Sequence, residues 1–369
     1  MKRIIISLAV FILTIIGTPL ATAASVDITI TEPTHRQIDG VFIDDDLIGL
    51  LAYEGRLGQL VFNPARGERS WYVDPQLVEE VTAMTSDYVL INGDTGVGAK
   101  VAKSWLNQFT AITRGERITA LPYGDPSGYW ISKLAPKLTD FYLQLGAKKL
   151  TAVLGRQVSQ MAQFPYNPAF KVDYLTIQTF KKAQSALRIN TKYMAADEVE
   201  KFKAQSAAVF HPGLENGQRT LLGLDLMTST QLLANKIRLA PGRFTVTSTK
   251  QNLPITLIND FPNPAKISVR ASTSNGKVLV GLVADQLVNG KSKVQVMIPV
   301  EVITSGKSSL TVSLTSDKGN ALGDEVLYPI TLKVISPIAT WITSGAAIIL
   351  FISALIQSFR RIRKKQNEQ

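Results

Sequence analysis

Residues 242–280 read GRFTVTSTKQNLPITLINDFPNPAKISVRASTSNGKVLV, and along them apolar and polar side chains alternate with a period of two. That period places every second side chain on the same face of a strand, as in a sheet with one buried face. Similar runs continue to residue 336, separated by turn sequences such as Asn289–Gly290. Residues 241–336 are therefore predicted to form an all-β, immunoglobulin-like sandwich of antiparallel strands.

Upstream of this segment, short apolar runs alternate with stretches of helical periodicity. Runs at 70–74, 87–91 and 117–124 are each followed by such a stretch. Strands separated by helices favour a mostly parallel sheet that helices cover. Residues 69–240 are therefore predicted to form an α/β domain. Its other expected elements are strands at 150–155, 189–194 and 207–211 and a closing helix from Leu221 to Arg238.

Residues 24–68 show a weaker pattern. Helical spacing between Leu47 and Leu60 predicts a helix there, with Asp44, Asp45 or Asp46 as its N-cap. This segment is predicted to pack on the α/β domain.

Both ends of the chain carry apolar segments. Lys2 and Arg3 precede an apolar run that ends before Ala21–Thr22–Ala23, which predicts a signal peptide over residues 1–23. Residues 338–359 contain no charged side chain and are long enough as a helix to cross roughly 30 Å of hydrocarbon. The basic tail, 360–369, is expected in the cytoplasm. The chain is therefore predicted to be a single-pass type I protein of the plasma membrane, with its ectodomain outside the cytoplasm.

Charge and cysteine content exclude several classes of protein. The net charge of +11 owes much to the ends, because seven of the 40 Lys and Arg residues lie in the signal peptide and the tail. The ectodomain has no basic stripe with interleaved aromatic residues, so nucleic acid is not an expected partner. The chain has no Cys, which rules out disulfides, thiolate metal sites and cysteine nucleophiles. No cofactor is expected.

Three patches of sequence resemble one known family. They are residues 242–280, the pair GRLGQLV (55–61) and WYVDPQLVEEV (71–81), and the pair SWLNQF (104–109) and LPYGDPS (121–127). The chain resembles a short version of an uncharacterised actinobacterial family of secreted, single-pass membrane-anchored envelope proteins, often encoded beside the lipid II flippase. The resemblance covers roughly residues 45–360.

The middle region of that family is distantly similar to the polysaccharide deacetylase barrel. This resemblance implies a partial or degenerate α/β barrel in residues 69–240, with Asp74 and Pro122–Tyr123 at positions that line a cleft. Such a deacetylase binds its metal through a His-x-x-x-His pair and an aspartate. The ectodomain has only His35 and His211, far apart in sequence, so no metal site is expected. A core or turn role is expected for His211.

Three aspartates would meet at the carboxyl ends of successive strands in an α/β barrel: Asp74, Asp94 and Asp125. Asp74 and Asp125 each precede a proline, and the favoured interpretation is that each caps the next helix. The alternative makes Asp74 and Asp125 a carboxylate pair for glycan hydrolysis or binding.

Aromatic residues cluster near the same loops, which suits stacking on sugar rings. Packing in the core is the alternative role for each of them. The candidate binding residues are thus Trp71, Tyr72, Asp74, Asp94, Tyr123, Asp125, Tyr129 and Trp130.

Two functions follow as hypotheses. The first is a non-catalytic, extracytoplasmic cell-envelope protein that binds peptidoglycan or another cell-wall glycan, a lipid-linked precursor, or a polytopic envelope protein such as the lipid II flippase. The second is a metal-independent, glycan-processing hydrolase that uses Asp74 and Asp125.

Overall fold

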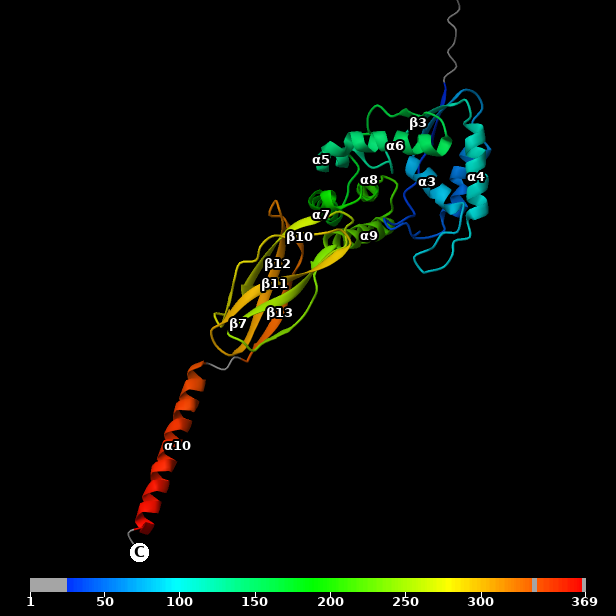
Figure 1. The fold of residues 1–369 in the computed structure, drawn as a ribbon. Helices are drawn as coiled ribbons and strands as arrows, with labels where there is room; N and C mark the ends of the chain where they lie inside the picture. Colours follow the sequence, from blue (N-terminus) through cyan, green and yellow to red (C-terminus); the bar gives the residue numbers. More distant parts are fainter. Residues whose placement is uncertain (1–24, 334–336, 367–369) are drawn as a thin grey trace, which may run out of the picture.

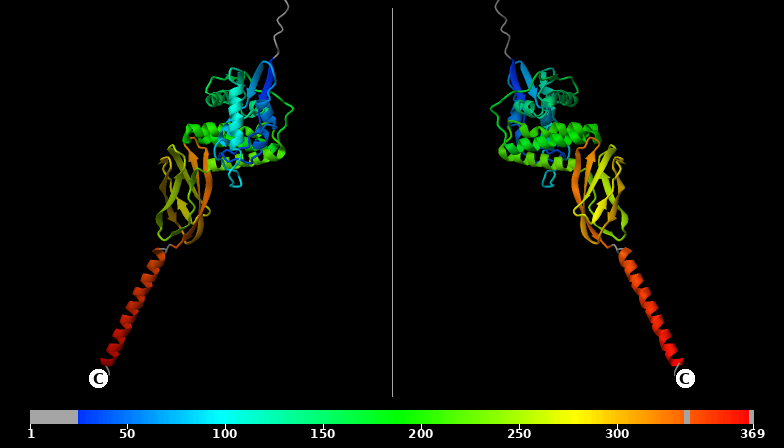
Figure 2. Two further views of the ribbon diagram at one scale, coloured as in Figure 1. Left: turned by 90° about the vertical axis from the view of Figure 1, so that its right-hand side faces the viewer. Right: turned by 90° about the vertical axis from the view of Figure 1, so that its left-hand side faces the viewer.

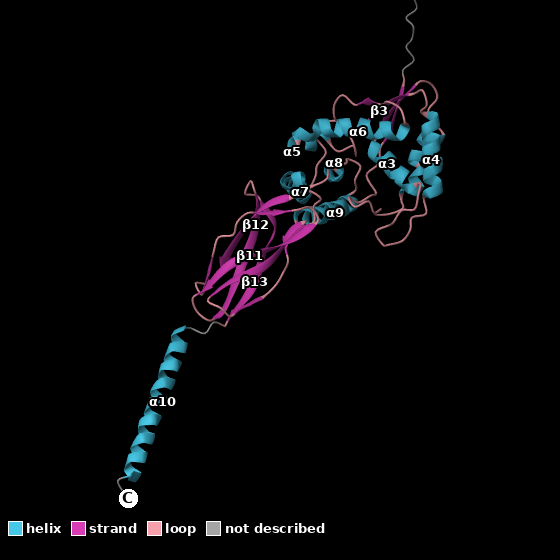
Figure 3. Cartoon of the chain, viewed as in Figure 1, coloured by secondary structure: helices cyan, strands magenta, loops and turns pink. Residues whose placement is uncertain are grey.

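The computed structural model describes residues 25–333 and 337–366 (Figure 1). The predicted signal peptide lies outside these residues. The described chain combines helices with three β-sheets and ends in a long helix, as the colouring by secondary structure shows (Figure 3). It is therefore a mixed α/β structure.

A four-stranded parallel sheet organises the first part of the chain. Its strands are β1 (Val26–Ile30), β2 (Arg69–Val73), β3 (Arg117–Ala120) and β4 (Ser159–Gln160), and their order in the sheet is their order in the chain. We call residues 25–160 the parallel-sheet part. The segment 24–68 was expected to pack on the α/β domain. Because β1 is an edge strand of this sheet, residues 25–68 are instead part of the domain.

Helices connect and cover these strands. They are α1 (Leu47–Leu51), α2 (Arg56–Phe62), α3 (Pro75–Met84), α4 (Ala99–Ile112), α5 (Gly128–Leu134), η1 (Pro136–Leu138) and α6 (Thr139–Leu154). Trp71, Trp105 and Phe109 are fully buried between sheet and helices, with Trp105 and Phe109 stacked at 5.2 Å between ring centroids. This cluster is the core of the parallel-sheet part.

The single helix expected between Leu47 and Leu60 is two helices, α1 and α2, separated near Gly55. A Cβ atom at Gly55 would lie 2.1 Å from the carbonyl oxygen of Gly49, so only glycine permits the close approach of the two segments. Asp46 is the N-cap residue of α1, but its side chain makes no capping hydrogen bond.

Four of the expected strands in the α/β region are wrong. Residues 150–155 form the last turn of α6 and its cap, because Gly155 ends the helix in a left-handed conformation at φ 64°. Residues 189–194 and 207–211 lie in helical turns, and 87–91 forms only isolated bridges. Short apolar runs fit a buried helix as well as a buried strand, so periodicity alone did not separate them.

A helical layer follows the parallel-sheet part. It contains α7 (Tyr174–Asn190), η2 (Thr191–Tyr193), α8 (Ala196–Ser206), η3 (Ala208–Phe210) and α9 (Asn216–Ala234). Helix α9 ends before the predicted Arg238, because residues 237–239 form strand β5 (Ile237–Leu239), which pairs with β7. The helical layer lies between the parallel-sheet part and the next two sheets (Figure 2).

Residues 237–332 form two sheets, which we call the two-sheet part. The five-stranded sheet has the order β10-β8-β12-β13-β6, and the four-stranded sheet has the order β5-β7-β11-β9. Strand β5 lies before the predicted boundary at residue 241, and β6 pairs with β13 in parallel, unlike the antiparallel pairing expected throughout. The strands after β5 are β6 (Phe244–Val246), β7 (Lys250–Asn259), β8 (Ala265–Thr273), β9 (Val278–Val280), β10 (Gln286–Val288), β11 (Ser292–Val302), β12 (Gly306–Ser316) and β13 (Ala321–Leu332).

The core of the two-sheet part continues into the helical layer. Tyr193 and Phe261 pack with ring centroids 5.8 Å apart. The Asn263 Nδ2 donates to the carbonyl oxygen of Met194 at 2.9 Å across the same boundary. These contacts join the helical layer to the sheets by one apolar core.

Helix α10 (Pro337–Gln366) extends away from the two-sheet part (Figure 1). Its segment Trp341–Ser358 has a mean hydropathy of 1.7 and none of it is buried. Length and composition therefore suit this helix for crossing a membrane.

Candidate functional site

The carboxyl ends of three adjacent parallel strands bring distant residues together. Thr31 follows β1, Asp74 follows β2, and the loop from Leu121 to Ser127 follows β3. Neighbouring parallel strands end at the same edge of a sheet, which is where α/β proteins place their sites. The candidate site lies at this edge.

Asp74 is fully buried and holds two backbone amides. Its Oδ1 accepts hydrogen bonds from the N–H groups of Gln76 and Gly124, both at 2.9 Å. Pro75 is the first residue of α3, so the predicted capping role of Asp74 is confirmed. Its Oδ2 has no partner among the described residues. Burial, and then the charge of Asp125, hold the pKa of Asp74 well above its usual range, which favours the protonated carboxyl.

Asp125 does not cap a helix, so the prediction for this residue is wrong. Helix α5 begins at Gly128 with Ser127 as its N-cap residue. Asp125 instead lies in a tight turn, with φ at 39° and its N–H donating to Pro122 at 2.8 Å. Left-handed backbone is costly for residues other than glycine and often occurs at functional positions. The preceding Gly124, with φ at 75°, helps the chain enter this turn.

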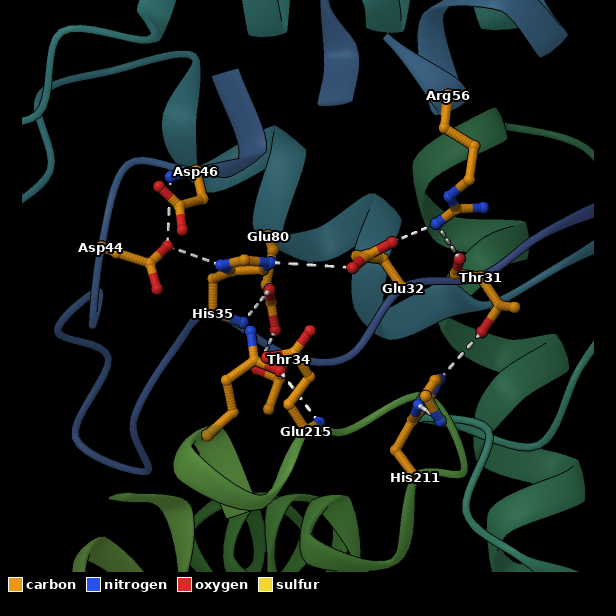
Figure 4. A network of polar contacts seen from close by, with 12 residues as sticks. Thr31, Glu32, Thr34, His35, Asp44, Asp46, Arg56, Glu80, His211 and Glu215 are labelled. Atoms are coloured by element: carbon orange, nitrogen blue, oxygen red, sulfur yellow. Dashed lines mark hydrogen bonds and ion pairs between the residues drawn. The ribbon is translucent and has the colours of Figure 1, made fainter. Parts of the chain in front are cut away.

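The Asp125 carboxylate ends a chain of hydrogen bonds that starts at His211. Its Oδ2 accepts from the Thr31 hydroxyl at 3.1 Å. The Thr31 Oγ1 also lies 3.1 Å from the Nε2 of His211 (Figure 4). The Nδ1 of His211 accepts from the N–H of Gly213 at 3.0 Å. Since Thr31 gives its one proton to Asp125, we infer that His211 carries its proton on Nε2 and donates to Thr31.

The pKa values along this chain suit the inferred protonation. Burial raises the pKa of Asp125 to about 6, although the Thr31 hydrogen bond opposes the shift. Burial lowers the pKa of His211 to about 4 and keeps the ring neutral at pH 7. Both ring nitrogens are engaged, which agrees with the structural role expected for His211.

The other predicted binding residues divide between the site edge, the core and the surface. Tyr123 is buried beside the aspartates, and its hydroxyl donates to Glu79 Oε2 at 2.6 Å. Trp71 and Trp130 are core residues, so stacking on a sugar is wrong for both. Tyr129 packs edge-on against Trp130 at 5.1 Å, and Tyr72 is half-buried.

Asp94 does not join the site. It is exposed in the loop between α3 and α4, where its Oδ2 accepts from the Asn92 amide at 2.7 Å. The run 87–91 before it is not a strand of the parallel sheet, so Asp94 has no strand end from which to reach the other aspartates. Asp74, Tyr123 and Asp125 are the predicted residues that the fold brings together.

A buried ionic network beside the site was not predicted (Figure 4). Glu80, on α3, is buried and accepts hydrogen bonds from the Thr34 hydroxyl and from the His35 N–H at 3.1 Å. The His35 Nδ1 pairs with Asp44 Oδ1 at 2.6 Å. One sequence signal could have predicted a buried acid here. Glu80 lies on the apolar face of α3, together with residues such as Leu77.

The pKa values of Glu80 and His35 are both raised, for different reasons. Burial raises the pKa of Glu80 to about 7, against the hydrogen bonds from Thr34 and His35. For His35, burial disfavours the charged ring, but the carboxylates of Asp44 and Glu32 outweigh burial and raise its pKa to about 10. The charge of Glu32 is in turn paired with Arg56. His35 is therefore a buried cation enclosed by acids.

A polar pocket of about 310 Å³ borders the site. Tyr123 and Glu79 line one side, and residues of α6 and α8 line the other, among them Lys149 and Glu200. The Lys149 Nζ lies 2.9 Å from Glu79 Oε1 and 3.8 Å from Glu200 Oε1. Among the described residues, no three His, Asp or Glu side chains are grouped to hold a metal ion. The arrangement offers hydrogen-bonding groups of both charges around one tyrosine.

Fold and site together define a mixed α/β protein with a candidate membrane-spanning helix and a buried carboxylate site. The chain belongs to a family whose description is "Family of unknown function (DUF6049)", which matches residues 175–367. The matched range begins in α7, so it contains His211 and the two-sheet part but neither Asp74 nor Asp125.

No curated protein matches this sequence. Similar solved structures include the native conformation of Escherichia coli alpha-2-macroglobulin, at 17% identity over 26% of this chain and 6% of that one, with a TM-score of 0.22. The Caenorhabditis elegans MSP family member WR4 is 14% identical over 27% of this chain and 98% of its own, with a TM-score of 0.21. The Vibrio cholerae secreted serine protease VesC is 7% identical over 29% of this chain and 26% of its own, with a TM-score of 0.23. These partial similarities leave the function to be argued from the site.

Proposed function

We propose that this protein is a non-catalytic, membrane-anchored protein of the cell envelope whose ectodomain binds a cell-wall glycan such as peptidoglycan. The observation that carries the proposal is the polar pocket beside Tyr123. Its volume of about 310 Å³ suits a small polar ligand such as a sugar unit. Charged groups of both signs, including Glu79 and Lys149, provide the donors and acceptors that hydroxyl groups require.

The carboxylates at the strand ends support binding over catalysis. Asp74 has no exposed surface, and one of its oxygens is already committed to two backbone amides. A glycosidase needs both carboxyl groups to reach the bond that is cleaved. We interpret the α/β region, residues 69–240, as a degenerate deacetylase-like barrel, and the two-sheet part as an immunoglobulin-like spacer.

The expected result is binding without turnover. Full-length protein in phosphatidylcholine nanodiscs should bind soluble muropeptides by calorimetry, while mass spectrometry detects no new product. Lys149→Ala should weaken binding about fivefold, since it removes one charged contact in the pocket. The matched control is Lys148→Ala, because Lys148 also pairs with Glu200 but does not line the pocket. Equal binding by the Lys149 variant and the wild type would contradict the proposal.

A second function has one observation in its favour. Asp125 combines a left-handed backbone, a pKa raised to about 6 by burial and a hydrogen-bond chain to His211. A carboxyl group with a pKa near neutrality suits acid–base catalysis in a metal-independent hydrolase. Release of reducing ends from peptidoglycan, lost in Asp74→Asn/Asp125→Asn, would favour this hydrolase over the binding protein.

For the anchor we propose type I topology, which the basic tail after α10 supports. The absence of native cysteine makes single-cysteine labelling free of background. A membrane-impermeant maleimide should label Lys318→Cys on intact protoplasts and Gln366→Cys only after lysis. The reverse pattern would refute this orientation.

A further inference from the structure

A second, larger cavity lies in the helix-rich region. It is a groove of about 710 Å³ between the α5–η1 segment, α7 and α8. We call it the basic groove. The basic groove and the polar pocket have no lining residue in common, although residues of α8 line both. The groove is therefore a separate site.

Apolar side chains form one component of the basic groove. The lining includes Leu134 and Leu138 from the α5–η1 segment and Leu187 from α7. An apolar surface of this kind gains free energy when an apolar ligand displaces water from it, by about 25 cal/mol per Å² of buried area. This part of the groove suits a hydrocarbon chain.

Cations form the other component. The lining contains Lys137, Lys181, Arg188 and Lys203, and it contains no Asp or Glu. Within residues 25–333 and 337–366, none of these four cations takes part in a salt bridge. This distinguishes the basic groove from the polar pocket, where Lys149 is paired with Glu79.

Helix α7 contributes two of these cations to the groove, Lys181 and Arg188. Lys181, Gln184, Ser185 and Arg188 all line it. Positions three, four and seven apart share one face of a helix, so these polar groups form a continuous stripe. Lys182 is exposed on the same helix but lies outside the lining, so two of the three cations of α7 line the groove.

A ligand must satisfy both components. A neutral apolar molecule would leave the four cations without a counter-ion, and a small anion would leave the half-buried Leu134 and Leu138 in contact with water. A phosphate monoester brings close to two negative charges at pH 7 and three acceptor oxygens, more than a single carboxylate offers. We propose that the basic groove binds a single amphiphile whose apolar chain carries a phosphate group.

The position of the groove indicates whether this ligand is a lipid within the bilayer or an amphiphile outside it. The two-sheet part lies between α10 and the helices of the groove (Figure 1). The headgroups of the bilayer that holds α10 are thus not the expected occupant. The ligand is an amphiphile that has left the bilayer. This proposal rests on the groove alone, so failure of muropeptide binding would leave it standing.

Photolabelling of full-length protein in phosphatidylcholine nanodiscs tests the proposal. The probe is a decyl phosphate with a diazirine on its alkyl chain, and labelled peptides are mapped by mass spectrometry. Label should appear on the segments around Leu134–Leu138 and Lys181–Arg188, and decyl phosphate should compete with it. Equal competition by decyl maltoside would show an apolar site only, and equal competition by inorganic phosphate would show an anion site only. Either outcome would overturn the proposal.

Reversing the charge of two cations in the basic groove provides a second test of the proposal. Lys181→Glu/Arg188→Glu should reduce labelling about tenfold, because two attractive charges become repulsive. Lys182→Glu, one residue away on the same helix, should label like the wild type. Both altered side chains of the double variant are exposed, and an unchanged melting temperature would show that it folds. Undiminished labelling of a folded double variant would also overturn the proposal.

Discussion

His35→Leu is expected to lower the free energy of unfolding by about 3 kcal/mol at pH 7, because it removes one member of a buried ion pair and leaves carboxylates without their counter-charge. The ring of His35 is buried, and it lies 2.6 Å from Asp44 and 4.0 Å from Glu32. Urea unfolding of the full-length protein in detergent micelles would measure the loss. Fluorescence is a suitable signal, since Trp71, Trp105 and Trp130 are all buried.

The pH dependence identifies the charge on His35. Its pKa is raised from 6.5 to about 10 in the folded protein, so the folded state retains a proton that the unfolded state loses. The stabilisation is fully present below pH 6.5 and is lost as the pH rises toward 10. Above the Glu80 transition near pH 7, stability should fall by about 1.4 kcal/mol per pH unit between pH 8 and 9.

The other histidine gives a matched control for this profile. The pKa of His211 is lowered to about 4, so its contribution is present above pH 6.5 and is lost as the pH falls toward 4. His211→Asn should therefore keep the slope between pH 8 and 9, and His35→Leu should abolish it. A flat wild-type profile in that window would show that His35 is uncharged.

The two histidines and their partners could not be predicted from the sequence, whereas other features could. The long strands of the two-sheet part were predictable, because alternation and turn residues act within a few positions of each other. The cap formed by Asp74 was predictable for the same reason. His35 and Glu80, in contrast, meet across 45 positions, and Thr31 and His211 across 180. No local pattern encodes such contacts.

Asp125 shows a second limit. Asp-Pro before a helix fits an N-cap, and at Asp74 that interpretation was confirmed. At Asp125 the same dipeptide follows Gly124, whose left-handed conformation turns the chain so that the helix starts later, at Gly128. The conformation of one preceding glycine decided between a cap and a site residue, and the dipeptide alone does not carry that information.

Asp74→Ala is the second change with a large expected effect, a loss of about 2–4 kcal/mol in the free energy of unfolding. The substitution removes the cap of α3, which is worth about 1 kcal/mol, and leaves the N–H of Gly124 buried without an acceptor, at about 1–3 kcal/mol. Urea unfolding of the full-length protein would measure it under the same conditions as for His35→Leu.

Asp74→Asn separates the role of the oxygen from the role of the charge. The amide keeps an acceptor for the N–H groups of Gln76 and Gly124, and it replaces a carboxyl group whose raised pKa favours the neutral form. The Asn variant should therefore stay within about 1 kcal/mol of the wild type. If it loses as much stability as Asp74→Ala, then Asp74 is ionised in the folded protein. An ionised Asp74 would then lie at the same edge of the sheet as Asp125, whose pKa of about 6 suits a proton donor. One ionised carboxylate beside one carboxylic acid is the arrangement that the hydrolase hypothesis requires and the binding hypothesis does not.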